Sequence, residues 1–364
     1  MNPKIIFAGG GTAGHVEPAL AVASELRKLK PNYQIIFAGT KKGLENQLVP
    51  AAGFSLVFIP KLLLPRQVTP GLLLWPFKFI AAIWQGVKIC KDADLIIGFG
   101  GYACPPIYLA AAILGKPIMV HEANAIPGWA NKLGVKFATE VFVAFSSAKQ
   151  KIGKWRSSKL IGMPLRTEIL DIHKLTDAQK NEMRINQIKK WGLSSDKPIL
   201  LVFGGSQGSR HINEAIMQTL SFFTENNIQV VHSVGRNNAL PTSTENYVPV
   251  PYIENMAAAY TACDLVIARS GALTCAELAA VGKFSLLIPL PVGNGEQSAN
   301  ARDLKEAGAA LVIEDSKFNA DWLISNWSEL LRSAKNFVPK PMPDNSASEV
   351  ISQEIIKKVE KLND

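Results

Sequence analysis

Residues 4–15 read Lys-Ile-Ile-Phe-Ala-Gly-Gly-Gly-Thr-Ala-Gly-His, and an apolar pattern of helical spacing follows over residues 18–29. A short apolar strand, a glycine-rich turn and a helix in this order are typical of a doubly wound α/β domain. Backbone amides at such a helix start can bind phosphate. Three of the glycines fit the dinucleotide spacing G-x-G-x-x-G, but the second expected strand ends Ala38-Gly39-Thr40 without an acidic residue. That absence weakens an NAD-binding interpretation.

The strand–turn–helix pattern recurs along the chain and pauses once. After the pause near residue 163, a charged stretch at 171–197 is expected to be rich in loops, and the pattern then restarts. We therefore predict an α/β fold of two Rossmann-like doubly wound domains facing across a cleft. The predicted parts are residues 1–162, residues 163–340, and a C-terminal helix within 341–364 that packs back on the first domain. Expected strands cover residues 4–8, 33–38, 94–98, 117–121, 140–144, 198–203, 229–234, 264–268, 284–290 and 310–314, and expected helices cover 18–29, 106–114, 210–223 and 346–362.

Composition narrows the class of protein. The chain has 364 residues, 48% of them hydrophobic, and a formal net charge of +9. It should fold, and the charge favours a phosphate-rich or membrane-surface partner. Four cysteines lie far apart without a CxxC pair, which disfavours a disulfide framework or a zinc site. We find no signal peptide and no apolar run long enough to span a membrane, so we expect a cytoplasmic protein.

Polar side chains after several strands mark candidate sites. His15 follows the first glycine loop, where a neutral imidazole could act as a general base, and His121-Glu122-Ala123-Asn124 ends another strand. In the second half, Ser270 is expected to cap a helix whose amides from Gly271 to Thr274 cradle a diphosphate. Glu277 in that helix could accept hydrogen bonds from ribose hydroxyls. Capping, packing or dipole complementarity are the structural alternatives for these residues.

Five motifs in order make the pattern specific. Together they resemble the MurG family, the bacterial GT-B glycosyltransferases of peptidoglycan synthesis, over about residues 5–305. The motifs are residues 9–15 (GGGTAGH), 100–102 (GGY), 121–128 (HEANAIPG), 204–209 (GGSQGS) and 269–274 (RSGALT).

The resemblance implies an inverting transfer of N-acetylglucosamine from UDP-GlcNAc to the C4 hydroxyl of the muramoyl sugar of lipid I, which forms lipid II. It implies that His15 is the general base and that the acceptor diphosphate lies near Gly11, Gly14, Gly100, Gly101 and Tyr102. It assigns to donor binding Thr12, Ala13, Gly14, Asn124, Arg166, Ser206, Ile253, Ala272, Leu273, Thr274, Cys275, Ala276, Glu277 and Gln297.

Two positions depart from the family pattern. Ala13 replaces a frequent glycine, and Glu296 stands where glutamine is common. The role of Glu296 at its edge of the donor site is therefore left unassigned. No D-x-D occurs in the second half, and a helix N-terminus could stabilise the departing diphosphate by itself. We therefore expect no metal and no cofactor, with UDP-GlcNAc as a substrate.

Residues 61–91 contain five basic residues, no acidic residue and many apolar ones. From Pro76 the spacing predicts an amphipathic helix with the proline near its start. A core helix with a basic solvated face is one interpretation; docking on an anionic bilayer is the other. The second would bring the enzyme to a lipid acceptor, peripherally, at the cytoplasmic face of the bacterial inner membrane, where other cell-wall synthesis proteins could be partners. The residues assigned to this surface are Leu73, Trp75, Phe79, Ile83, Trp84, Lys78 and Lys88.

Three alternative functions remain open on sequence grounds. Another GT-B enzyme could use the same loops with a different nucleotide sugar, and an NAD-dependent oxidoreductase could use the first glycine loop. A nucleic-acid binder would fit the positive charge, but no basic-aromatic motif or recognised module supports it.

Overall fold

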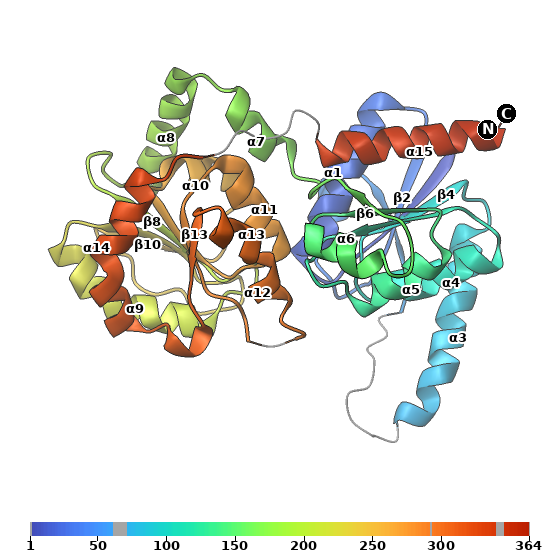
Figure 1. Ribbon diagram of the computed structural model, residues 1–364, viewed down its shortest axis with the longest axis horizontal. Coiled ribbons are helices and arrows are strands. Elements are labelled where there is room, and N and C mark those ends of the chain that lie inside the picture. Colours follow the sequence, from blue (N-terminus) through green and yellow to red (C-terminus); the bar gives the residue numbers. More distant parts are fainter. Residues whose placement is uncertain (1, 61–70, 292, 340–345, 364) are drawn as a thin grey trace. The chain divides into compact units, whose positions relative to one another are not determined.

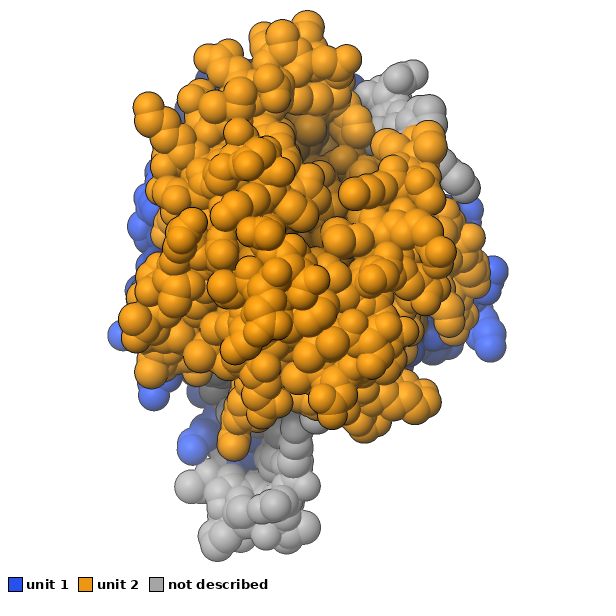
Figure 2. Space-filling model, turned by 90° about the vertical axis from the view of Figure 1, so that its left-hand side faces the viewer, with its two compact units in different colours: residues 1–166, 343–364 blue, residues 167–342 orange. Residues whose placement is uncertain are grey.

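The computed structural model describes residues 2–60, 71–291, 293–339 and 346–363. Contacts between Cα atoms divide the chain into two compact units (Figure 2), which are described separately below. Unit 1 contains residues 1–166 and 343–364, and unit 2 contains residues 167–342.

Unit 1 is built on a seven-stranded parallel sheet in the order β3-β2-β1-β4-β5-β6-β7, with helices on both faces (Figure 1). Its strands are β1 (Lys4–Ala8), β2 (Gln34–Gly39), β3 (Ser55–Phe58), β4 (Leu95–Gly98), β5 (Ile118–Glu122), β6 (Glu140–Val143) and β7 (Lys159–Leu160). Its helices are α1 (Ala13–Leu29), α2 (Glu45–Ala51), α3 (Gly71–Cys90), α4 (Cys104–Ile113), α5 (Trp129–Phe137), α6 (Ser146–Ile152) and α15 (Ala347–Asn363).

The central strands of unit 1 are mainly apolar because both faces of the sheet are covered. Ile5, Ile6 and Phe7 of β1 are fully buried. Helix α15 completes one face: Ile351 and Ile355 belong to the same core cluster as Phe7. The side chain of Ser352 donates a hydrogen bond to the Val22 carbonyl of α1 at 3.3 Å, so the C-terminal helix packs on α1.

Unit 2 repeats this architecture with a six-stranded parallel sheet in the order β10-β9-β8-β11-β12-β13. Its strands are β8 (Ile199–Phe203), β9 (Gln229–Ser233), β10 (Tyr247–Val250), β11 (Leu265–Ala268), β12 (Ser285–Leu287) and β13 (Ala310–Val312). Its helices are α7 (Thr167–Leu170), α8 (Asp177–Trp191), α9 (Arg210–Glu225), α10 (Met256–Ala262), α11 (Ala272–Val281), α12 (Glu296–Asn300), α13 (Arg302–Glu306) and α14 (Ala320–Asn336), with short 3-10 turns at Asp171–Lys174 and Asp315–Lys317. The predicted pair of doubly wound α/β domains is confirmed.

Two expectations about helices were wrong. The charged stretch at 171–197 is not mainly loop, because α8 occupies fifteen of its residues and starts with a capping box between Thr176 and Gln179. Helix α3 begins at Gly71, so Pro76 lies inside the helix and not at its start. No helix in the described part of the chain is long and apolar enough to cross a bilayer.

Candidate functional site

In unit 1 the glycine loops meet where the strand order reverses. Strands β1 and β4 are neighbours in the sheet, while the chain continues outward from each in opposite directions. Ligands of such folds bind at this switch point, beyond the carboxyl ends of the strands. Gly100 and Gly101 both have positive φ, and a Cβ on Gly101 would collide with the Gly10 carbonyl oxygen. Only glycine allows this close approach of the two loops.

The first loop is held from inside the protein by Glu45 of α2. The backbone N–H of Gly11 donates to Glu45 Oε2 at 2.8 Å. The Gly11 amide thus already binds a carboxylate within the protein, and the assignment of Gly11 to the acceptor diphosphate stays a prediction. Gly14, Gly100, Gly101 and Tyr102 remain at the same edge of the sheet, and Tyr102 lies beside Gly11.

His15 lies in the first turn of α1 and is partly buried. Its Nδ1 is 3.2 Å from the Gly10 carbonyl oxygen and 3.3 Å from Thr12 Oγ1. Burial lowers the pKa of His15, and the hydrogen bond to Gly10 and the charge of Glu45 oppose that shift without reversing it. At neutral pH the imidazole is thus largely in the neutral form, which a general base requires. Thr12 is the exposed N-cap residue of α1, followed by Ala13 and Gly14.

Residues 121–124, at the end of β5 and just beyond it, were predicted to line a site, but most of them are buried. His121 and Glu122 are buried, and only Asn124 is partly exposed. Glu122 accepts hydrogen bonds from the backbone amides of Asn124 at 2.8 Å and Gly128 at 3.1 Å. Burial raises the pKa of Glu122, and these hydrogen bonds oppose the rise. The carboxylate therefore shapes the loop from within and does not face a ligand.

Asn131 of α5 is a residue of this region that the sequence did not single out. Its side-chain amide donates to Glu122 Oε2 and to the His121 carbonyl, each at 3.0 Å. Its oxygen accepts from the Tyr108 hydroxyl at 2.9 Å. The only sequence sign of Asn131 is a polar residue on the side of the helix that is buried in the structure. Its hydrogen-bond partners are apparent only in the fold.

Unit 2 has a matching switch point between β8 and β11. The loop 204–209 leads from β8 into α9, and residues 269–271 lead from β11 into α11. Gly271 is the N-cap residue of α11 and provides no side-chain cap. The expectation that Ser270 caps this helix was wrong: Ser270 is fully buried and its hydroxyl has no partner among the described residues. No side chain caps the first-turn amides of α11, as an anion-binding site at this helix start requires.

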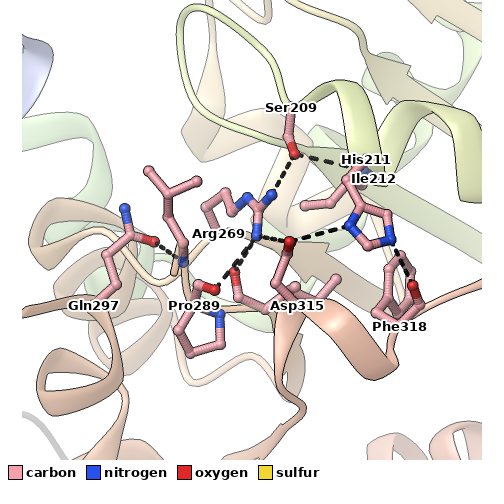
Figure 3. Close-up of polar contacts among 10 residues, drawn as sticks. Ser209, His211, Ile212, Arg269, Pro289, Gln297, Asp315 and Phe318 are labelled. Carbon is pink, nitrogen blue, oxygen red and sulfur yellow. Dashed lines mark hydrogen bonds and ion pairs between the residues drawn. The ribbon is translucent and has the colours of Figure 1, made fainter. Parts of the chain in front are cut away.

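Arg269 links the loops around this point (Figure 3). Its guanidinium pairs with Asp315 Oδ1 at 2.5 Å and donates to Ser209 Oγ at 2.7 Å. It also donates to the Ile288 carbonyl at 3.2 Å, beyond β12. Ser209 in turn caps α9 by accepting from the Ile212 amide at 3.4 Å. The buried Arg269 side chain therefore links four segments: the end of its own strand β11, the start of α9, the residue after β12 and the 3-10 turn at Asp315–Lys317.

His211 closes the same cluster from α9. Its Nδ1 lies 3.1 Å from Asp315 Oδ2, and its Nε2 lies 2.7 Å from the Phe318 carbonyl (Figure 3). Burial would raise the pKa of Asp315, but hydrogen bonds from Arg269 and His211 outweigh it and the pKa is lowered. The carboxylate is thus ionised and holds the side chains of Arg269 and His211 in place. No spacing rule joins Arg269 to Asp315, so this pair could not be predicted from the sequence.

The other residues assigned to donor binding lie in several segments. Glu277 is buried and accepts from the Tyr260 hydroxyl at 3.0 Å, while Gln297 Oε1 accepts from the Leu290 amide at 3.0 Å. Ser206 is partly exposed in the loop 204–209. In α11, Ala272 and Cys275 are buried, Leu273, Thr274 and Ala276 are partly exposed, and Ile253 is buried before α10. Arg166 belongs to unit 1, where its Nε is 4.0 Å from Glu17 Oε2.

Comparison with known proteins decides the family. The model of the glycosyltransferase family 28 N-terminal domain matches residues 5–143, and that of the C-terminal domain matches residues 199–359. A Thermobifida fusca protein is 43% identical over 92% of this chain and 87% of its own length. The chain belongs to glycosyltransferase family 28. That relative is named UDP-N-acetylglucosamine--N-acetylmuramyl-(pentapeptide) pyrophosphoryl-undecaprenol N-acetylglucosamine transferase.

Other members of family 28 carry the same name. They include proteins of Streptomyces avermitilis, 42% identical over 88% of each chain, and Corynebacterium diphtheriae, 42% identical over 93% of this chain and 90% of its own. The structure of Acinetobacter baumannii MurG is similar, with a TM-score of 0.70, 27% identity and coverage of 98% and 99%. The S. aureus MnaA–UDP structure, at 14% identity and a TM-score of 0.69 over 100% and 98%, shares the fold. The predicted resemblance and the GT-B fold are confirmed.

Helix α3 of this family 28 protein presents an apolar outer face. Phe77, Ile80 and Trp84 are 70%, 52% and 65% exposed, and they recur at helical spacing. Trp75 and Phe79, which the sequence assigned to this surface, instead stack on each other at 5.0 Å between ring centroids and are half-buried, as is Ile83. Lys78 and Lys88 are exposed. The side chain of Leu73 lies outside the described residues.

Proposed function

We propose that this protein transfers N-acetylglucosamine from UDP-GlcNAc to the C4 hydroxyl of the muramoyl sugar of lipid I. The product would be lipid II, an intermediate of peptidoglycan synthesis. The observation that carries the proposal is the 43% identity, over nine-tenths of the chain, to a transferase named for this reaction. The two glycine-loop switch points, one in each unit, are the local geometry that such a reaction needs.

In this proposal unit 2 binds the donor. The uncapped amides at the start of α11 and its helix dipole favour the diphosphate of UDP. Ser206, Ile253, Gln297 and the first turns of α11 are the proposed donor residues of unit 2, and Arg166 of unit 1 is a further proposed donor residue. The Glu277 carboxylate, which accepts a hydrogen bond from the Tyr260 hydroxyl, is the proposed contact to a ribose hydroxyl. From unit 1, Thr12, Ala13, Gly14 and Asn124 are the proposed contacts to the transferred sugar.

The proposed chemistry is a single displacement with inversion. His15 Nε2 removes the proton from the acceptor hydroxyl while that oxygen forms a bond to C1 of N-acetylglucosamine. The bond from C1 to the diphosphate oxygen breaks, and UDP leaves with the electron pair. The amides of α11 stabilise the growing negative charge on the diphosphate. The reaction as proposed uses no metal ion, which stays a prediction.

We also propose that α3 attaches the protein peripherally to an anionic membrane surface, on the cytoplasmic face. Phe77, Ile80 and Trp84 would enter the interface, and Lys78 and Lys88 would meet the headgroups. An acceptor that stays in the bilayer supplies the reason for such a surface. Contacts with other cell-wall synthesis proteins would form at the same membrane.

Ligand-dependent melting tests the donor class. A ligand that binds only the native state raises the melting temperature. We expect UDP and UDP-GlcNAc to raise it, and NAD and DNA to leave it unchanged. A shift with NAD alone would refute the proposal. The choice among nucleotide sugars is then made by comparing UDP-GlcNAc with UDP-glucose as donors to a soluble lipid I analogue.

A further inference from the structure

The peptide between Gly10 and Gly11 has both of its polar atoms engaged. Its N–H donates to Glu45 Oε2 at 2.8 Å, and its carbonyl oxygen lies 3.2 Å from His15 Nδ1. Because a peptide unit is planar, these two hydrogen bonds leave it on opposite sides. A carboxylate, a peptide and an imidazole therefore form one continuous row.

The row determines which nitrogen of His15 carries hydrogen. A carbonyl oxygen can only accept, so the contact between Gly10 and His15 is a hydrogen bond only when Nδ1 is protonated. A neutral imidazole has a single N–H, which leaves Nε2 with a free lone pair. Thr12 Oγ1, 3.3 Å from Nδ1, can serve as a second acceptor for the same hydrogen.

Glu45 is held firmly for this task. Its side chain is 1% exposed, and its Oε1 accepts from both the backbone N–H and the hydroxyl of Thr40, at 2.7 Å and 2.8 Å. A Cβ on Gly10 would lie 2.5 Å from Oε1, and one on Gly39 would lie 2.5 Å from the Glu45 Cγ. Within the described residues, no lysine or arginine forms an ion pair with it. Thr40 thus anchors Oε1, and Oε2 binds the backbone of the loop at Gly11.

We propose that Glu45 is a positioning residue that orients His15 through the 10–11 peptide. By binding the Gly11 N–H, it keeps the Gly10 carbonyl directed at Nδ1 and leaves Nε2 for the acceptor hydroxyl. Hydrogen bonds in such a row polarise one another, so the carboxylate also strengthens the acceptor that faces the imidazole. Carboxylates in Ser-His-Asp triads set the histidine tautomer by direct contact. Here the contact is relayed by one peptide, and the inference rests on His15 being the base.

The tautomer can be measured without a kinetic assay. The chain has five histidines, so ¹⁵N-histidine labelling gives a simple spectrum, and a His15→Gln variant assigns the His15 signals. We expect the wild-type protein above the pKa of His15 to show a protonated Nδ1 and an unprotonated Nε2. A His15 ring with hydrogen mainly on Nε2 would overturn the proposal, even if no Glu45 variant could be produced.

Two variants at Glu45 test the consequence for turnover. In the wild type, both carboxylate oxygens of Glu45 accept hydrogen bonds. Glu45→Gln keeps only one accepting oxygen, and Glu45→Met keeps the side-chain length without a carboxylate or amide oxygen to accept a hydrogen bond. We expect kcat to fall in the order wild type, Glu45→Gln, Glu45→Met, by roughly tenfold or more for the last, since a misplaced tautomer removes base catalysis. The KM for UDP-GlcNAc should change by less than about twofold, because donor binding does not use the base. The protonated fraction of His15 Nδ1 should fall in the same order.

A matched control separates positioning from stability. Ile355→Val destabilises the same unit through the packing of α15 on α1, without touching the hydrogen bonds of Glu45, and should keep the wild-type kcat. If Glu45→Met turns over as fast as this control while His15→Ala is inactive, Glu45 has no positioning role and the base assignment stands. A loss of kcat with an unchanged tautomer would also overturn the proposal. An active His15→Ala variant would instead refute the base itself.

Discussion

Replacing Arg269 by alanine should destabilise unit 2 and weaken donor binding together. The substitution removes the partner of Asp315 at 2.5 Å and the donors to Ser209 and the Ile288 carbonyl. Removing one member of a buried ion pair costs about 3–5 kcal/mol. Because the Asp315 side chain keeps 16% exposure, we expect the lower limit, about 3 kcal/mol. For a unit of this size that lowers the melting temperature by about 6–12 °C.

Calorimetry and donor titration measure the two effects of Arg269→Ala. The dissociation constant for UDP should rise at least tenfold, because Ser209 and the segment after β12 lose their common anchor. Arg210→Ala is the matched control: it removes an exposed arginine that pairs with Glu214 at 2.7 Å on the surface of the same unit. Surface pairs contribute little. If Arg269→Ala melted at the same temperature as Arg210→Ala and bound UDP normally, Arg269 would not organise the loops.

Three further predictions follow from the site, the metal-free chemistry and the outer face of α3. Burial lowers the pKa of His15 below its ordinary value of 6.5, so kcat should stay high at neutral pH and fall only as acid protonates the imidazole; a fall beginning above pH 6.5 would contradict this. Turnover should persist in EDTA, and a complete loss that magnesium restores would refute the metal-free mechanism. Serine at Phe77, Ile80 and Trp84 should reduce binding to anionic liposomes while soluble-acceptor turnover persists; the control is Trp155→Ser, which removes an exposed tryptophan elsewhere in unit 1.

The sequence predicted the central strands well because their signal is local, whereas β3, β7 and β10 were not predicted. Each central strand is a short apolar run bounded by glycine or polar residues, as in β1 and β8, and such runs are identified from neighbouring residues alone. Helix α8 was missed because its composition is mostly polar. The capping box from Thr176 to Gln179 was the available sign of its start.

The supports of the site were less accessible to prediction. Glu45 is 34 residues from Gly11, and Asp315 is 46 residues from Arg269. Their contacts depend on which strands become neighbours, and residue types do not specify that. The glycine loops themselves were found, since positive φ at Gly11 and Gly100 needs glycine at those positions. The hydrogen bond from the Gly11 amide to Glu45 was not predicted, because it depends on the fold.

Transfer of labelled N-acetylglucosamine to a lipid I analogue tests the proposed reaction most directly. The measurement compares the wild-type protein with His15→Ala and records UDP binding for both. We expect the wild type to form the disaccharide product, and the variant to lose turnover while it binds UDP normally. If the wild type forms no product from UDP-GlcNAc, the proposed reaction is wrong. If the variant keeps near-normal turnover, His15 is not the base.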